Sequence, residues 1–210
     1  MDKINKQKHF LLTNDKIIRS ELRKDLDRMC KKHVDTKIIE ELGISHGLAR
    51  IDIAVVNGII HGYELKSDMD NLKRLPQQII AYNAVLDKVT LVVGEAHLYQ
   101  AIRIIPEWWG ITVTSPLSPN QNLNLIKIRK PEQNPNQNSQ AIAMLLWREE
   151  ALNILEKMGK AKGLKSKNRK QIYEKLVELL TQKELKNIVR KQLHFRINWR
   201  SDQRCILNDG

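Results

Sequence analysis

Cysteine is scarce in this sequence, and long hydrophobic runs are absent from it. The only two cysteines, Cys30 and Cys205, lie far apart and outside any Cys-x-x-Cys or Cys/His spacing. This pattern excludes a zinc centre or a disulfide framework and favours a reducing compartment. No apolar run is long enough to cross a bilayer, and the first residues lack the apolar stretch typical of a signal peptide. We therefore expect a cytoplasmic protein.

Acidic residues are also few compared with basic ones. The chain has 36 Lys and Arg against 24 Asp and Glu, a formal net charge of +12. Residues 139–210 carry much of the excess, with 16 basic and 8 acidic side chains. A surplus of this size favours a polyanionic partner. No segment combines a basic amphipathic helix with Trp or Phe, as membrane-surface binding requires. We expect a nucleic acid as the partner, and DNA rather than RNA. We expect no binding to membranes, and a homodimer is one option.

The apolar pattern divides the chain into two parts. Strand-like and helical runs alternate over residues 1–130, which predicts an α/β core. Residues 131–139, PEQNPNQNS, contain two prolines and no large apolar side chain, so we expect a solvated linker. Residues 140–210 are expected to form a small basic, all-helical module. Its predicted helices are 140–158, 168–181 and 182–194.

Periodicity predicts most elements of the core. Apolar residues recur at helical spacing over 15–32, whereas the stretch 35–44 fits neither period and leaves helix and strand both open. The remaining predicted helices are 71–86 and 95–104, and the predicted strands are 49–56, 59–66, 89–94, 111–116 and 123–130.

The most informative segment is the pair of Ile- and Val-rich strands joined by Asn57-Gly58, a dipeptide typical of hairpin turns. The first strand carries Asp52, and the second carries Glu64 and Lys66, which share a face because side chains alternate along a strand. Two nearby carboxylates repel each other and a buried lysine is costly to desolvate. A divalent cation resolves both problems, and magnesium prefers carboxylates, water and phosphate oxygens. We therefore predict a Mg²⁺ site, at which Mn²⁺ could substitute.

Two further features of the hairpin bear on this site. Gly62 shares the face of Glu64, and its missing side chain would let a metal-bound phosphate approach closely. A strict two-residue turn would pair Val56 with Ile59. That register leaves Asp52 and Glu64 on opposite faces, whereas a three-residue connection or a bulge sets them across from each other. We therefore predict an irregular turn.

Asp52 followed by Glu64-Leu65-Lys66 across a hairpin resembles the signature of the PD-(D/E)XK, or restriction-endonuclease-like, nuclease superfamily. The leading proline of the motif is absent, since Ile51 precedes Asp52, at the most freely varied position. The resemblance implies a restriction-endonuclease-like mixed sheet flanked by helices, and a magnesium-dependent phosphodiester hydrolase. Asp52 and Glu64 would bind the metal with the main-chain carbonyl of Leu65, and Lys66 would act on the attacking water.

Other residues fit the same resemblance. Superfamily members often carry an acidic residue upstream of the hairpin, where Glu40 and Glu41 are both placed and Glu41 is preferred as an assisting catalytic residue. Gln78 and Tyr82 match the Gln-x-x-x-Tyr of several branches, including the RecB type, and Arg74 lies one helical turn earlier. A wider run is similar to a bacterial group of the superfamily, through Arg50, Lys66-Ser67-Asp68, Trp108-Trp109-Gly110 and LLWREEAL.

The basic stretch 157–176 resembles a SAP-type module that binds the DNA backbone, although a solvated charged loop is an equal alternative. Its lysines would raise affinity in a salt-dependent manner that ignores base sequence. The predicted nucleic-acid contacts are Arg50, Arg74, Gln78, Tyr82, Lys165, Lys167, Arg169 and Lys170.

Each of these assignments has a structural alternative. Asp52, Glu64 and Lys66 could form a surface salt-bridge cluster, and Gln78 and Tyr82 could serve local packing alone. The two tryptophans, Trp108 and Trp109, are expected in the core rather than stacked on bases. The rival function is a non-catalytic DNA-binding or scaffolding protein that keeps the nuclease fold.

Overall fold

The computed structural model describes residues 12–30, 35–115 and 123–196. One six-stranded sheet, with its strands in sequence order, forms the centre of the molecule. β4 pairs in parallel with both β3 and β5, and the other neighbours are antiparallel. The strands are β1 (Lys37–Ile44), β2 (Ala49–Val56), β3 (Ile60–Lys66), β4 (Lys88–Gly94), β5 (Gly110–Ser115) and β6 (Asn124–Arg129).

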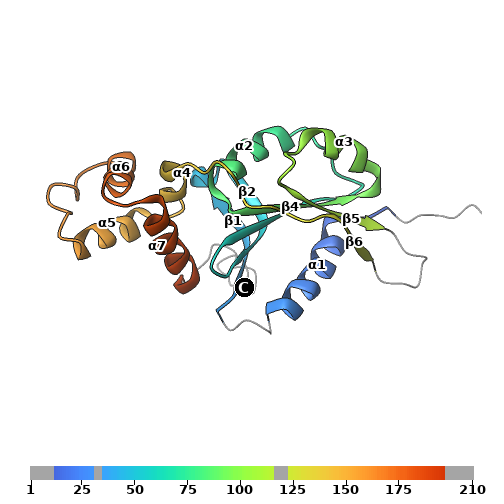
Figure 1. Cartoon of the computed structure of the whole chain (residues 1–210), viewed down its shortest axis with the longest axis horizontal. Coiled ribbons are helices and arrows are strands. Elements are labelled where there is room, and N and C mark those ends of the chain that lie inside the picture. Colours follow the sequence, from blue (N-terminus) through green and yellow to red (C-terminus); the bar gives the residue numbers. More distant parts are fainter. Residues whose placement is uncertain (1–11, 31–34, 116–122, 197–210) are drawn as a thin grey trace, which may run out of the picture.

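Helices cover both faces of this sheet. α1 (Asp15–Cys30) lies on one face, while α2 (Leu75–Val85) and α3 (Leu98–Ile104) lie on the other (Figure 1). Two short 3-10 turns, η1 (Ser45–Gly47) and η2 (Glu95–His97), precede β2 and α3. The predicted α/β architecture, a mixed sheet flanked by helices, is therefore confirmed. Within the described ranges, no helix is long and apolar enough to cross a membrane.

The segment that fitted neither period is strand β1. Ile39 and Leu42 are three residues apart, yet both belong to the same buried cluster, and so do their counterparts Ile51 and Ala54 on β2. The alternation is interrupted at Glu41, whose φ of 55° lies in the left-handed region. A strand with such an irregularity does not display a clean two-residue period, which explains why the sequence left the choice open.

The turn between β2 and β3 is irregular, as predicted. Val56 pairs with Ile60 and Ile53 pairs with Tyr63, so three residues separate the last paired positions. The Asn57 N–H donates to the Ile59 carbonyl at 3.1 Å. The pairing ends at Ile53 and Tyr63, and the Asp52 side chain just before it accepts the Leu65 N–H, so Asp52 lies next to the Glu64–Leu65 segment of β3.

Gly62 does not have the role expected for it. A Cβ atom built there would lie 2.6 Å from Leu86 Cδ1 and 3.0 Å from Ile51 Cγ1. The space beside this glycine is therefore filled by core side chains from both neighbours. The expectation that it leaves room for a phosphate is wrong, because the face of Gly62 is covered by the packing beneath α2.

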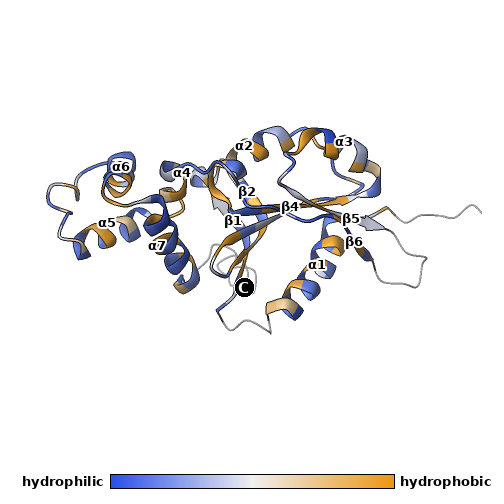
Figure 2. Ribbon diagram, viewed as in Figure 1, coloured by the Kyte–Doolittle hydropathy of each residue, from blue (hydrophilic) through white to orange (hydrophobic). Residues whose placement is uncertain are grey.

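Four helices complete the described chain: α4 (Ser139–Ala143), α5 (Arg148–Lys157), α6 (Arg169–Leu179) and α7 (Gln182–Phe195). The helix predicted over 140–158 is broken between α4 and α5. There the Leu146 carbonyl accepts a hydrogen bond from Tyr173 Oη at 2.9 Å, and the Glu150 carboxylate accepts the Trp147 N–H at 2.7 Å. Side chains thus satisfy the backbone groups that a continuous helix would pair. α5 shows hydrophilic and hydrophobic residues along its length (Figure 2).

The segment 131–139 has no regular secondary structure before α4 and most of its residues are exposed, as expected of a solvated loop, but Asn134 anchors it to the core. Asn134 is only 7% exposed, and its amide donates to the carbonyls of Asn83 at 2.7 Å and Leu86 at 2.8 Å. One buried cluster includes residues of the sheet, of α2 and of α4 to α7. Polar composition predicted the exposed part of this segment and missed Asn134, whose amide replaces water with main-chain partners at the end of α2.

His61 on β3 provides a pH-dependent contribution to stability. Its ring nitrogens lie 2.9 Å from Thr90 Oγ1 and 3.2 Å from Tyr63 Oη. Burial, with the nearby charge of Lys88, lowers the pKa of His61 to about 4. Between about pH 6.5 and 4 the unfolded chain therefore takes up a proton that the folded chain does not. As the pH is lowered through this window, the free energy of unfolding should decrease by at most about 1.4 kcal/mol per pH unit.

The measurement is chemical unfolding of the wild type and of His61→Gln at pH 7 and pH 5. Because all other groups titrate in both proteins, the difference between their pH slopes isolates His61. We expect the variant to lose less stability on acidification. Parallel slopes for the two proteins would contradict the assignment.

Candidate active site

Glu64 is the centre of a buried polar cluster at the end of β3. Its side chain is 1% exposed and accepts three hydrogen bonds. Lys66 Nζ at 2.5 Å and Gln78 Nε2 at 2.6 Å reach Oε1, and Tyr82 Oη reaches Oε2 at 2.7 Å. Glu64 and Lys66 therefore share a face, as their spacing predicts, and both are buried. A surface salt bridge, the alternative considered for them, is excluded by this burial.

α2 supplies two of the three hydrogen-bond donors to Glu64. Pro76 stands in the first turn, where a missing N–H costs nothing, and Gln78 and Tyr82 follow on one face of the helix. Tyr82 Oη also lies 2.6 Å from the Arg50 carbonyl, so the hydroxyl joins β2 to β3. Arg74 precedes the helix and is exposed. Gln78 and Tyr82, two of the three residues predicted to act from this helix, therefore contact the carboxylate, whereas Arg74 lies at the surface.

Asp52 lies beside this cluster and is oriented by the backbone of β3. Its Oδ2 accepts the Leu65 N–H at 2.8 Å, and its Oδ1 accepts a hydrogen bond from Arg19 Nη2 at 2.9 Å. The side chain is 19% exposed, so one edge of the carboxylate is open to solvent. The carboxylate is therefore fixed in place and still accessible.

Arg19 on α1 was not predicted from the sequence. Besides Asp52, its guanidinium contacts Asp15 Oδ2 at 3.1 Å and Glu41 Oε1 at 3.3 Å. The only local signal was the helical spacing of Asp15 and Arg19, which is common on exposed helices. Nothing in the sequence indicates that α1 packs where this arginine reaches the hairpin.

Of the two upstream glutamates, Glu41 is the one beside Asp52. It pairs with Arg19 and with Arg50, whose Nη1 is 3.3 Å from Glu41 Oε2. Glu40 instead pairs with Arg23 at 2.8 Å. Glu41 has a left-handed φ, so its side chain points away from that of Glu40. Of these two glutamates, only Glu41, the one preferred from the sequence, reaches the cluster.

The three carboxylates are all poorly stabilised as anions. Burial, followed by the charge of Asp52, raises the pKa of Glu64 to about 7, although Lys66 and Tyr82 oppose the shift. Burial also raises the pKa of Asp52, against the Leu65 N–H and Arg19, and that of Glu41, where Asp52 adds to the effect. A bound cation would lower all three pKa values, because it stabilises the charged forms.

The donor set fits magnesium. Among the described residues no three His, Cys, Asp or Glu side chains gather as a metal site. The predicted set needs only two carboxylates and a carbonyl, since magnesium keeps several waters. Asp52 accepts the N–H of Leu65, the residue after Glu64, and Gln78 Oε1 is buried without a hydrogen-bond partner. A buried acceptor without a partner, beside carboxylates with raised pKa values, would suit a hydrated cation.

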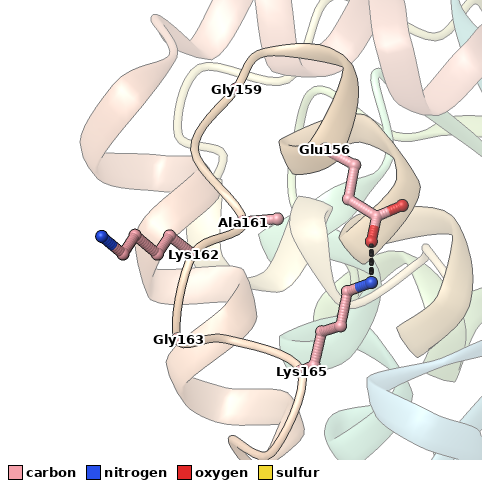
Figure 3. Close-up of a pocket in the computed structure, with 6 residues that line it drawn as sticks. All are labelled: Glu156, Gly159, Ala161, Lys162, Gly163 and Lys165. Atoms are coloured by element: carbon pink, nitrogen blue, oxygen red, sulfur yellow. Dashed lines mark ion pairs between the residues drawn. The ribbon is translucent and has the colours of Figure 1, made fainter.

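The predicted basic contacts of the C-terminal helices lie apart from this cluster. The loop between α5 and α6 is at the left end of the molecule, whereas the sheet lies at its centre and right (Figure 1). Lys165 pairs with Glu156 at 2.9 Å, whereas Lys162 points away from the small pocket that they line (Figure 3). Arg148 fixes the loop by donating to the carbonyls of Lys165 at 2.6 Å and Lys167 at 3.2 Å. Arg169 and Lys170 begin α6 and are exposed.

Trp109 confirms the expectation of a core role for the tryptophan pair. It is fully buried, and its indole N–H donates to Asn83 Oδ1 at 2.9 Å. Trp108 is partly buried and packs on the same cluster. The Trp109 ring is therefore not available as a platform for bases.

Fold and site together define a mixed α/β protein with a buried carboxylate–lysine–tyrosine cluster at a hairpin. The chain belongs to the bacteriophage P4 protein cII family, whose model matches residues 11–208. Protein cII of Enterobacteria phage P4 is 40% identical over 58 residues, which cover 28% of this chain and 22% of that protein. A protein of unknown function from Silicibacter pomeroyi has a TM-score of 0.39 at 16% identity, over 70% of this chain and 94% of that one.

Proposed function

We propose that this chain is a magnesium-dependent nuclease with a restriction-endonuclease-like core. It would hydrolyse phosphodiester bonds in DNA rather than in RNA. The observation that carries the proposal is the buried Glu64–Lys66 pair with Asp52 beside it. A core gains little from such a group of charges, because desolvation offsets their attraction. Perturbed carboxylates of this kind gather at sites where charge is needed for chemistry.

Each residue has a defined task in this proposal. Asp52, Glu64 and the Leu65 carbonyl would hold Mg²⁺, or Mn²⁺ in its place, and the metal would supply positive charge against the scissile phosphate. Lys66 donates hydrogen bonds, so it can orient the attacking water and stabilise the charge that grows on the phosphate oxygens. Tyr82 and Gln78 hold Glu64 in position. Glu41 would assist through a water molecule.

The basic side chains would hold the substrate. Arg50 is half-exposed beside Glu41, and Arg74 is exposed at the start of α2. The lysines and arginines of the C-terminal helices would add binding that depends on salt and ignores base sequence. The proposed partner is therefore a nucleic acid, and pairing of two chains on it is compatible with the proposal.

One observation favours a second candidate, a non-catalytic DNA-binding or scaffolding protein. Glu64 already has three protein donors, and Arg19 already neutralises Asp52. A polar network whose carboxylates already have protein partners can serve to fix the packing of α2 on the sheet without any chemistry.

Cleavage assays separate the two candidates. The purified chain is incubated with single-stranded, nicked and branched DNA, and with RNA, in the presence of Mg²⁺ or Mn²⁺. We expect the wild type to cut at least one substrate and Asp52→Asn to lose the activity, since the asparagine keeps the size of the side chain but not its charge. If the wild type cuts nothing with either metal, the nuclease proposal fails and the binding protein remains.

A further inference from the structure

A second cavity lies between the β1–β2 connection and the C-terminal helices. It has a volume of about 600 Å³ and is lined by η1, by the end of α4 and by the start of α6. This volume lies within the range of sites that hold small organic groups. The side chains of His46, Met144 and Tyr173 form its apolar part.

Two aromatic rings form one wall. The rings of His46 and Tyr173 stack with their centroids 5.6 Å apart. Tyr173 is held by its hydrogen bond to the Leu146 carbonyl, and His46 has a φ of 58°, which a residue with a side chain rarely adopts. Partial desolvation and the charge of Arg169 lower the pKa of His46, which favours the neutral ring. Tyr173 is 1% exposed and His46 is exposed, so the accessible part of this aromatic wall is mainly the His46 ring.

Two cations stand at the rim. In the ranges that the structure describes, the Arg169 guanidinium makes no hydrogen bond or ion pair, and Lys170 reaches only Glu174, at 3.8 Å. The described residues that line the cavity include no Asp or Glu. Arginine binds phosphate oxygens with two parallel hydrogen bonds. The rim therefore has charges that suit phosphates next to an apolar group.

We infer that this cavity binds one unpaired nucleobase, with Arg169 and Lys170 on the adjoining phosphates. A base has an apolar face that stacks on aromatic rings, at about 1–3 kcal/mol per base. Base-paired DNA cannot offer such a face. The inference rests on the proposed function and deepens it, because it names a strand with unpaired bases as the substrate.

The cavity is close enough to the proposed active site for one strand to reach both. His46 precedes Asp52 by six residues, which span at most about 20 Å as extended chain. A nucleic acid strand covers this distance with about six stacked nucleotides, at about 3.4 Å each. The cavity would therefore anchor the strand a few nucleotides from the bond that is cut.

Binding is measured without metal, so that cutting does not affect it. Fluorescence anisotropy in EDTA compares a labelled oligothymidylate with an abasic strand of equal length and charge. We expect the wild type to bind the strand with bases at least about tenfold more tightly, the equivalent of about 1.4 kcal/mol. Equal affinities would overturn the inference, since they would show that only the phosphates are bound.

Variants locate the preference. Met144→Trp fills the cavity, and His46→Gly removes one ring while relieving the left-handed φ, so at least one of them should fold, as melting temperatures will show. We expect both to bind the two strands nearly equally. A variant that folds and keeps the full preference for bases would overturn the inference.

A matched pair of charge variants tests the rim. R169Q/K170Q should weaken binding to oligothymidylate about tenfold or more. R103Q/K127Q removes the same charge from exposed positions on α3 and β6, at the far side of the molecule from α6 (Figure 1), and should weaken it less than about threefold. Equal losses would place the phosphates elsewhere. If the base preference persists but nothing is cut when Mg²⁺ or Mn²⁺ is added, the nuclease proposal fails and the cavity assignment stands.

Discussion

Replacing Lys66 with alanine is expected to slow metal-dependent cleavage by roughly 10²–10³-fold, the usual cost of losing one group that stabilises the transition state. Lys66 Nζ is 2.5 Å from Glu64 Oε1, and the Lys66 side chain is 9% exposed. Water therefore cannot readily take the place of its ammonium group. The measurement is the single-turnover rate at saturating enzyme, on the substrate that the wild type cuts best.

Lys127→Ala is the matched control for this variant. Lys127 lies on strand β6, is exposed, and belongs to no contact near Glu64, so its removal should change the cleavage rate by less than about threefold. Both variants should keep their folded circular dichroism spectrum, since Glu64 retains Gln78 and Tyr82 as donors. Wild-type cleavage by a folded Lys66→Ala would show that the lysine has no role in the reaction.

Asp87→Ala is expected to lower the free energy of unfolding by about 3–5 kcal/mol, the usual effect of removing one partner of a buried ion pair. Asp87 has a 2% exposed side chain, pairs with Lys186 of α7, and accepts the Ile60 N–H at 2.7 Å. The alanine leaves both a lysine and a main-chain donor without this acceptor. Urea unfolding followed by tryptophan fluorescence measures the loss.

A double variant shows where the energy comes from. Asp87→Asn with Lys186→Met keeps an acceptor for the Ile60 N–H and removes the uncompensated charge, so it should recover at least half of the loss. Because Asp87 joins β3 and α7, its removal should also shift the unfolding of the sheet and of the C-terminal helices together. Two separate transitions in the wild type would contradict that link between the two parts.

The candidate site residues Asp52, Glu64 and Lys66 could be predicted because the features that bring them together are local. Glu64 and Lys66 share a face through the two-residue period of any strand, and the spacing of Gln78 and Tyr82 places them on one face of any helix. The requirement that Asp52 oppose Glu64 predicted the irregular turn that the Val56–Ile60 pairing shows.

The expectation for Gly62 was wrong and the burial of Asn134 was missed, for a physical reason that the two residues share. A glycine on the face of Glu64 suggested open space, but Leu86 and Ile51 fill that space from other elements. A polar run with two prolines suggested solvent, but Asn134 finds main-chain carbonyls at the end of α2. Composition describes what a residue prefers in water, and it does not say which neighbours replace the water.

The sequence by itself determined the positive charge, the strands that form the hairpin, and the shared face of Glu64 and Lys66, because these depend on composition and on backbone periods alone. Only the tertiary structure decided that Arg19 of α1 reaches Asp52, that Glu41 rather than Glu40 joins the site, and that His46 stacks on Tyr173. Each of these contacts joins residues whose distance is set by how helices and strands pack. That packing is a property of the whole buried core, so no local sequence pattern can predict it.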